Sequence, residues 1–260
     1  MKKWILGISV LLLALSCVGQ KDDPEPEVDP EPGKTEVEEF PAGEGYFRRC
    51  LVLDFTGTWC VNCPKMESAI EEAQEKWPGR LLCISVHNLD AMELAPQGQE
   101  LAARFGVAAY PSAVIDLDAA SLVSTASSEL LMSHCRRLLE GRSRSAGIRL
   151  NTVLADGKVN AQVEAQAVRE GYYTLHCVLL EDGIVAPQTG GSQEHIHNNV
   201  LRGWCDSEAY TLAAPGKLEW SCSFDAAPGM RLLAFVCHGD FVDNVISCSV
   251  GEIVDYQYEE

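Results

Sequence analysis

Positive charge is scarce in this sequence and is nowhere gathered into a run. Lysine and arginine together number 20, against 38 aspartate and glutamate residues, so the formal net charge is −18 at pH 7. Nucleic acids and anionic lipid surfaces are bound mainly by clusters of lysine and arginine, whose contacts release counterions. The sequence therefore excludes nucleic acid as a partner, and it excludes attachment to a membrane by charge alone.

The start of the chain lacks an apolar run long enough to cross a bilayer. Lys2 and Lys3 precede an apolar stretch of about 12 residues, Trp4 to Leu15, whereas a spanning helix needs roughly 20. The stretch ends in ALSC, which resembles a bacterial lipobox. We therefore predict a signal peptide over residues 1–16 and a lipid on Cys17. An ordinary cleaved signal followed by an incidental cysteine is the alternative.

Residues 17–45 have few apolar side chains and alternate proline with aspartate and glutamate. Proline and repulsion between like charges both favour an extended chain, so we expect a tether that spaces the folded part from the membrane. Lys21-Asp22-Asp23 resembles the surface-export signal of lipoproteins from the Bacteroides group. We expect a protein of the bacterial cell envelope, lipid-anchored to the outer membrane. The tripeptide favours surface exposure, and the sequence leaves the leaflet open.

The 11 cysteines show no repeated spacing of the kind that a disulfide scaffold has. Cys83, Cys177, Cys237 and Cys248 each lie inside an apolar run, and free cysteine commonly behaves as a small buried hydrophobe. We interpret these four as core residues. Export would permit disulfides, but the sequence leaves their pairing open.

The chain has no internal repeat, and its hydrophobic pattern changes near residue 145. Before that point, apolar runs at 50–55, 80–87 and 112–117 predict strands, and helical periodicity predicts helices at 60–77, 97–105 and 127–141. This alternation predicts an α/β domain over residues 46–144.

After that point, apolar and polar residues alternate along short segments. Asp156-Gly157 is a strong hairpin signal. Further strands are expected at 172–181, 217–224, 231–238 and 245–254. This pattern predicts an all-β sandwich over residues 145–260.

One motif carries chemistry, namely Trp59-Cys60-Val61-Asn62-Cys63, placed where a strand passes into a helix. Free backbone N–H groups and the helix dipole stabilise an anion there, so we expect Cys60 to be the nucleophilic thiolate. Cys63 lies one turn on and is expected to resolve the mixed disulfide formed at Cys60. Asp54, on the preceding strand, is expected to take the proton of Cys63 as a desolvated acid.

Tyr110-Pro111, in the segment GVAAYPSAVID, enters a predicted strand after a turn marked by glycine. Such an X-Pro bond is a candidate cis peptide. It would leave the Tyr110 backbone free to pair with a bound thiol substrate. We therefore predict that Trp59, Tyr110 and Pro111 bind the substrate.

These two segments resemble those of thioredoxin. DFTGTWCVNCPK resembles its active-site segment and GVAAYPSAVID its cis-proline segment. More narrowly, DFTGTWCVNCP and HNNVLRGW resemble the thioredoxin-like outer-membrane lipoproteins of the twenty-eight-kilodalton type. That resemblance implies a thioredoxin-like domain followed by an immunoglobulin-like β domain.

Two positions depart from the thioredoxin pattern. Val61-Asn62 stands where classical thioredoxin has Gly-Pro. Because this dipeptide sets the redox poise, reductant, oxidant and isomerase all stay open. No lysine aligns to partner Asp54, which places its proton-transfer role in question.

The sequence thus favours an extracytoplasmic thiol–disulfide oxidoreductase that acts on protein thiols or disulfides and needs no cofactor beyond the cysteine pair. The alternative is a surface or outer-membrane binding or adhesion lipoprotein, in which the thioredoxin fold is not catalytic and the β domain binds. An exposed, reactive Cys60 distinguishes the first from the second, in which the β domain covers it.

Other interpretations of single features stay open. No second CxxC or spaced histidine pair completes a zinc site, but copper delivery by the two cysteines and His87 is conceivable, as is a purely structural disulfide. The polar cluster of the second domain is either a ligand site or a hydrogen-bonded turn with its arginine on a carboxylate. That cluster comprises His195, His197, Asn198, Asn199 and Arg202, and the aromatics that mark either a partner surface or core are Trp204, Tyr210 and Trp220.

Overall fold

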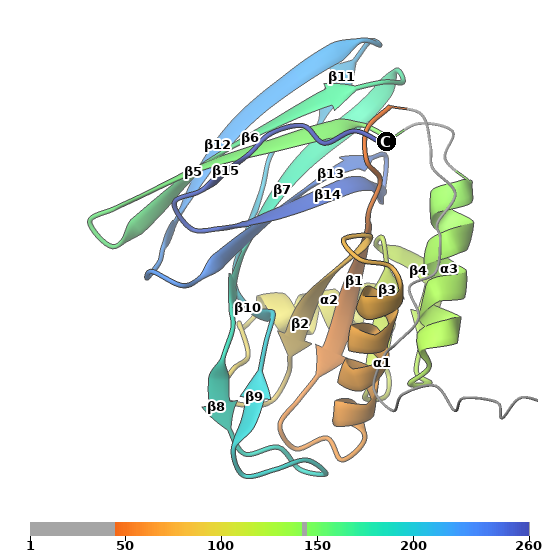
Figure 1. Cartoon of the computed structure of the whole chain (residues 1–260), viewed down its shortest axis with the longest axis vertical. Coiled ribbons are helices and arrows are strands. Elements are labelled where there is room, and N and C mark those ends of the chain that lie inside the picture. Colours follow the sequence, from red (N-terminus) through yellow and green to blue (C-terminus); the bar gives the residue numbers. More distant parts are fainter. Residues whose placement is uncertain (1–44, 142–144, 260) are drawn as a thin grey trace, which may run out of the picture. The chain divides into compact units, whose positions relative to one another are not determined.

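The computed structural model describes residues 45–141 and 145–259 (Figure 1). The predicted signal peptide, the predicted lipidation site at Cys17 and nearly all of the predicted tether lie outside these residues. Among the described residues, no helix has the length and apolar character needed to cross a membrane.

The first part of the described chain alternates strands and helices, as predicted. β1 pairs in parallel with β2 and antiparallel with β3, and β3 pairs antiparallel with β4, so the local order is β2-β1-β3-β4. The elements are β1 (Cys50–Thr56), α1 (Cys63–Lys76), β2 (Leu81–His87), α2 (Gln97–Arg104), β3 (Ser112–Ile115), β4 (Asp118–Val123) and α3 (Ser128–Glu140).

The three helices cover both faces of this sheet because successive side chains of a strand point to opposite faces. Cys50 and Val52 of β1 pack with α1 and α3. Leu53 and Phe55 of the same strand pack with α2 on the other face. On α1 the residues predicted to face the core are all buried, namely Met66, Ile70, Ala73 and, just after the helix, Trp77.

The second part is the predicted β sandwich. A four-stranded sheet of order β12-β6-β5-β15 packs on strands β7, β13 and β14 of the larger sheet through a shared apolar core. Asp156 and Gly157 both have positive φ and form the predicted tight turn between β5 and β6. The strands are β5 (Gly147–Ala155), β6 (Lys158–Ala167), β7 (Gly171–Glu181), β8 (Ile184–Ala186), β9 (His195–His197), β10 (Val200–Asp206), β11 (Tyr210–Leu212), β12 (Gly216–Asp225), β13 (Arg231–His238), β14 (Phe241–Ser249) and β15 (Ile253–Val254).

One sheet continues from the α/β part into the sandwich. Its order is β14-β13-β7-β10-β2-β1-β3-β4, with β11 paired to β7. Val200 of β10 lies opposite Ser85 of β2, and the Ser85 N–H donates to the Asn199 carbonyl at 2.8 Å. The predicted boundary at residues 144–145 falls between α3 and β5. The described residues of both parts belong to one compact unit.

Between β7 and β10 the chain leaves the sandwich as a two-stranded hairpin, residues 184–197, which we call the β8–β9 hairpin. The Thr189 N–H at its tip donates to the Thr58 carbonyl at 2.8 Å. The tip therefore lies against the loop that leads into α1 (Figure 1). Through this hairpin the strand-rich part reaches the cysteine motif.

Candidate functional site

The cysteine motif sits on the loop between β1 and α1. Gly57 permits a tight turn there, because a Cβ at this position would lie 2.6 Å from the indole nitrogen of Trp59. The indole N–H donates to the Asn88 carbonyl at 2.9 Å. These two contacts fix the direction in which the chain enters the motif.

Cys60 and Cys63 are joined by a disulfide. The helix begins at Cys63, not at Cys60 as predicted. Pro64 occupies the first turn of α1, where a residue without an N–H is tolerated. Before it, the Cys60 N–H donates to the Gly57 carbonyl at 3.0 Å and forms a turn outside the helix. Cys63 is therefore the cysteine at the helix N-terminus, and Cys60 precedes it in a turn.

The cysteine pair is covered. Cys60 is 4% exposed and Cys63 is 2% exposed. Gln188 of the β8–β9 hairpin donates through its side-chain amide to the Cys60 carbonyl at 2.9 Å. Gly190, with φ +81°, approaches so closely that a Cβ would lie 2.1 Å from the Val61 carbonyl oxygen. The second part of the chain thus covers the disulfide in this structure.

Asp54 lies in the middle of β1, 4% exposed. Its Oδ1 has no hydrogen-bond partner among the described residues. Burial, together with the charge of Glu67, raises the pKa of Asp54 to about 8. The carboxyl is therefore mostly protonated at neutral pH, in a state from which it can donate a proton.

A pocket of about 20 Å³ connects Asp54 with Cys63, which leaves room for about one water molecule. Among the residues that the structure describes, no lysine or arginine lines this pocket. The α/β part contributes Asp54, Thr56, Cys63, Pro64, Glu67, Ser85 and His87, and the region of the hairpin contributes Gln188, His195, His197 and Asn198.

Histidines gather at this pocket from two distant segments. His195 Nε2 lies 2.8 Å from Glu67 Oε2, and His87 Nδ1 lies 2.8 Å from Asp90 Oδ2. His197 is 5% exposed, and its Nε2 has no partner among the described residues. Burial and the neighbouring His87 and His195 lower the pKa of His197 to about 4, so its ring is neutral at physiological pH.

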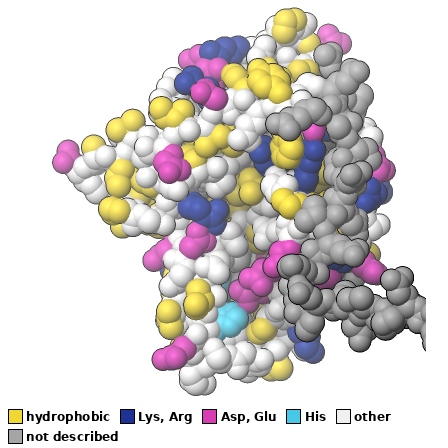
Figure 2. Space-filling model, viewed as in Figure 1, with side chains coloured by type: hydrophobic (Ala, Val, Ile, Leu, Met, Phe, Trp, Pro, Cys, Tyr) yellow, Lys and Arg dark blue, Asp and Glu magenta, His cyan; other side chains and the backbone are white. Residues whose placement is uncertain are grey.

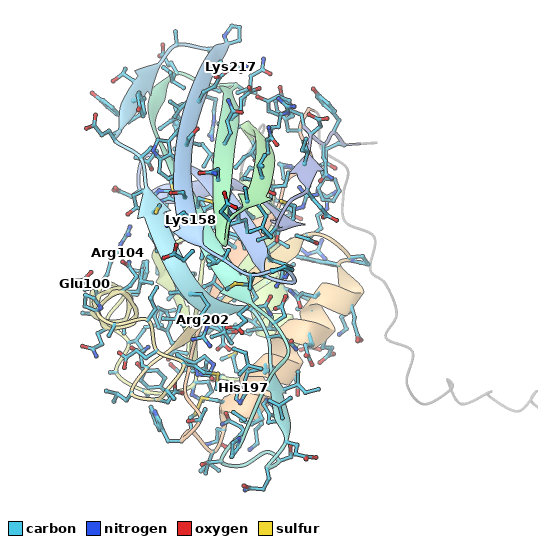
Figure 3. All side chains as sticks on the ribbon, turned by 90° about the vertical axis from the view of Figure 1, so that its left-hand side faces the viewer. Glu100, Arg104, Lys158, His197, Arg202 and Lys217 are labelled. Carbon is cyan, nitrogen blue, oxygen red and sulfur yellow. A yellow bond between two sulfur atoms is a disulfide. The ribbon has the colours of Figure 1, made fainter. Side chains whose placement is uncertain are left out.

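The polar cluster that the sequence singles out in the second part therefore has two roles. His195, His197 and Asn198 line the pocket; Figure 3 shows His197 near the start of α1. Arg202 instead donates to Glu181 at 2.7 Å and to the Met92 carbonyl at 3.2 Å. Asn199 accepts a hydrogen bond from Arg231 at 2.7 Å. Arg202 and Asn199 therefore make hydrogen bonds that hold the fold together, as expected if this part of the cluster is a hydrogen-bonded turn.

The Tyr110–Pro111 peptide bond is cis, as predicted, and directly precedes β3. Pro111 is buried and Tyr110 is partly exposed. The Tyr110 ring meets the Trp59 ring edge-on, with 5.2 Å between centroids. Trp59 is 43% exposed. The two aromatic residues predicted to bind substrate thus form one aromatic surface beside the motif.

The other described cysteines are free thiols, and the four predicted to be core residues are buried. One of these four, Cys177, lies opposite Cys205 on adjacent strands and hydrogen-bonds Cys222. The hydrogen bond from Cys177, joined by one from Cys205, lowers the pKa of Cys222, which is partly exposed.

The remaining sequence features are the aromatic residues of the second part, the charged side chains and the possible metal ligands. Trp204 and Trp220 are partly buried against the apolar cores, and Tyr210 is 36% exposed. Acidic and basic side chains are interspersed on the face in Figure 2. Within residues 45–141 and 145–259, no group of three or more His, Cys, Asp or Glu is arranged to hold a metal ion.

Comparison with known proteins supports the fold of the first part. The thioredoxin family model matches residues 45–129. No curated protein matches the sequence. The solved structure of HBP35 of Porphyromonas gingivalis is similar over 80% of this chain and 76% of that chain, with 17% sequence identity and a TM-score of 0.67. The E. coli curli protein CsgC matches 40% of this chain and 97% of its own, with 13% identity and a TM-score of 0.25. Only the first of these similarities is close enough to show a shared fold.

Proposed function

We propose that this protein is an extracytoplasmic thiol–disulfide oxidoreductase, similar to the thioredoxin-like outer-membrane lipoproteins of the twenty-eight-kilodalton type. One observation carries the proposal. A disulfide at the start of a helix shares a small polar pocket with Asp54, a buried carboxyl whose pKa is raised to about 8. A disulfide that only stabilises a fold has no need of a proton donor beside it, because it never opens.

The arrangement supports a two-step exchange. A substrate thiolate attacks the Cys60 sulfur, the Cys60–Cys63 bond breaks, and the electron pair stays on Cys63. Asp54 donates its proton to the Cys63 sulfur. A second substrate thiolate then attacks the substrate sulfur of the mixed disulfide and releases Cys60, so that the substrate loses two electrons and the cysteine pair gains them. The reverse sequence reduces a substrate disulfide, with Asp54 accepting the proton of Cys63.

The substrate class that fits is a protein thiol or disulfide. Trp59 and Tyr110 present an aromatic surface next to the motif, and such surfaces bind polypeptide segments well. No cofactor enters the exchange, because both electrons reside on the cysteine pair.

One observation favours a second candidate, a binding lipoprotein whose thioredoxin fold is not catalytic. Cys60 is only 4% exposed, under the β8–β9 hairpin. In that case the disulfide is a structural link and the strand-rich part carries the binding surface.

Trapping of partners separates the two candidates. We expect Cys63→Ala to accumulate mixed disulfides in cells, because Cys60 attacks substrate disulfides and nothing releases them. Cys60→Ala should accumulate none, and it is the matched control because it removes the same disulfide. Complexes are read on non-reducing gels and should vanish with dithiothreitol. A folded, exported Cys63→Ala protein that forms no such complexes would refute catalysis and leave the binding function.

Attachment to the envelope is proposed on the sequence alone, through a lipid on Cys17. Labelling of cells with a radioactive fatty acid should mark the protein and fail to mark a Cys17→Ala variant. Label that persists in the variant would contradict the anchor.

A further inference from the structure

Two buried polar atoms without hydrogen-bond partners face the same pocket. They are Asp54 Oδ1 and His197 Nε2, each without a partner among the described residues, and both residues line the pocket of about 20 Å³. Buried polar atoms are seldom left unpaired, because the loss of their contact with water costs free energy that a hydrogen bond normally offsets. A polar pocket with room for about one water molecule can hold a water that hydrogen-bonds both atoms and through which a proton can reach Asp54.

A second pair lies where this pocket meets solvent. His195 Nε2 is 2.8 Å from Glu67 Oε2, and the two side chains are 20% and 29% exposed. Glu67 is four residues after Cys63 on α1, so both side chains lie on the same face of the helix. Partial exposure allows this pair to exchange protons with bulk water, which the buried Asp54 cannot do directly.

We propose that Glu67 and His195 carry the proton of Asp54 to and from solvent when the Cys60–Cys63 disulfide opens and closes, and that His197 orients the path; these three residues are here called the proton-exit cluster. This inference rests on the proposed function and extends it. The β8–β9 hairpin then supplies one acid–base group, His195, and one hydrogen-bond acceptor, His197, to the thioredoxin-like domain in addition to covering its disulfide.

The protons balance in each direction. When the disulfide opens, Asp54 gives one proton to Cys63 and becomes a carboxylate. One proton then enters through the Glu67–His195 pair and the pocket and restores the carboxyl, while the neutral His197 ring accepts a hydrogen bond that orients the path. When the disulfide closes, Cys63 gives its proton to Asp54 and the proton leaves by the same route.

The charged groups around the cluster fit this role. Burial raises the pKa of Glu67 in spite of its contact with His195, and the charge of Glu71 on the next turn adds to the rise. The buried His87–Asp90 pair packs from the side of β2. Two carboxyl groups and three histidines therefore line the pocket, so that groups able to give and take protons lie close to Asp54.

The test is a single-turnover opening of the disulfide in the full protein. Excess dithiothreitol is added between pH 6 and 9, and free thiols are alkylated and counted over time. Glu67→Gln and His195→Gln remove the exchange of protons, and Gln at 67 can still hydrogen-bond His195. His176→Gln is the matched control, because His176 pairs with Asp206 at 2.6 Å outside the pocket.

The pH dependence of the rate of disulfide opening distinguishes proton transfer from a purely structural role. For Glu67→Gln and His195→Gln, we expect the ratio of variant to wild-type rate to fall at least about tenfold from pH 9 to pH 6. At high pH the Cys63 thiolate leaves without needing a proton. Added imidazole should restore the rate at pH 6, and His176→Gln should keep the wild-type profile.

If Glu67 and His195 only hold the β8–β9 hairpin in place and carry no proton, the result is different. Loosening the hairpin changes the rate by the same factor at every pH, and imidazole has no effect. That outcome in a folded Glu67→Gln protein would overturn the inference while leaving the proposed function intact. A wild-type disulfide that opens no faster than oxidised glutathione at every pH would instead refute the proposed function.

Discussion

Gly190→Ala tests how the β8–β9 hairpin controls access to the disulfide. A Cβ at residue 190 would lie 2.1 Å from the Val61 carbonyl oxygen, and real Cβ contacts essentially never fall below 3.0 Å. The tip must therefore withdraw by about 1 Å, which weakens the Thr189 and Gln188 hydrogen bonds to the motif loop. Each such bond contributes about 1 kcal/mol net. The left-handed backbone, with φ +81°, adds roughly 1 kcal/mol of strain for alanine.

Together these terms shift the equilibrium between covered and uncovered cysteines by about 2–3 kcal/mol, or roughly 30- to 150-fold. The rate at which a phosphine reduces the Cys60–Cys63 disulfide follows the uncovered fraction when opening precedes reduction. We expect Gly190→Ala to be reduced about 30 to 150 times faster than wild type, measured by alkylation and mass spectrometry after timed quenching.

Gly183→Ala is the matched control. Gly183 immediately precedes the same hairpin with φ +73°, and no atom of the described residues lies within 4 Å of a Cβ built there. It imposes the same backbone strain without a contact to the motif loop, so its disulfide should be reduced at nearly the wild-type rate. Equal reduction rates for Gly190→Ala and wild type would show that the hairpin does not limit access.

Three further predictions concern the buried groups. The pKa of Asp54 is raised on folding, so the stability it contributes is complete below pH 4 and is lost as pH rises to about 8. Chemical denaturation should therefore show Asp54→Asn to be more stable than wild type at pH 9, by up to about 6 kcal/mol, and about as stable at pH 4. A difference in the free energy of unfolding that is the same at every pH would contradict the assigned pKa. Brief iodoacetamide treatment at pH 7 should label Cys222 in the oxidised protein and should label Cys60 only after mild reduction. Burial raises the pKa of Cys237 to about 12, so this thiol should stay unlabelled until the protein unfolds. Glu259→Gln should lower the free energy of unfolding by about 3 kcal/mol, because Glu259 accepts two hydrogen bonds of 2.8 Å from the buried Arg80. A loss below about 1 kcal/mol in a denaturant titration would show that this ion pair contributes little to stability.

Much of the fold is predictable from local pattern. The α/β alternation, the buried face of α1 and the Asp156-Gly157 turn all follow from spacings within a few residues. The association of Asp54 with Cys63 was also predictable, because a strand and the helix that follows it place residues at a fixed offset. The sequence pattern places the start of α1 three residues early, because apolar periodicity does not register that Pro64 favours the first turn of a helix.

The sequence by itself determined the residues to which the proposed chemistry is assigned, namely Cys60, Cys63 and Asp54, and the faces of the main strands and helices that are buried. Tertiary structure alone decided what covers them. Strands β8 and β9 have three residues each, too few for a periodic signal, and β10 joins β2 through one residue pair. Glu67 and His195 meet although 128 positions separate them. Local periodicity records that a side chain is buried, but which distant segment buries it depends on how the whole chain packs.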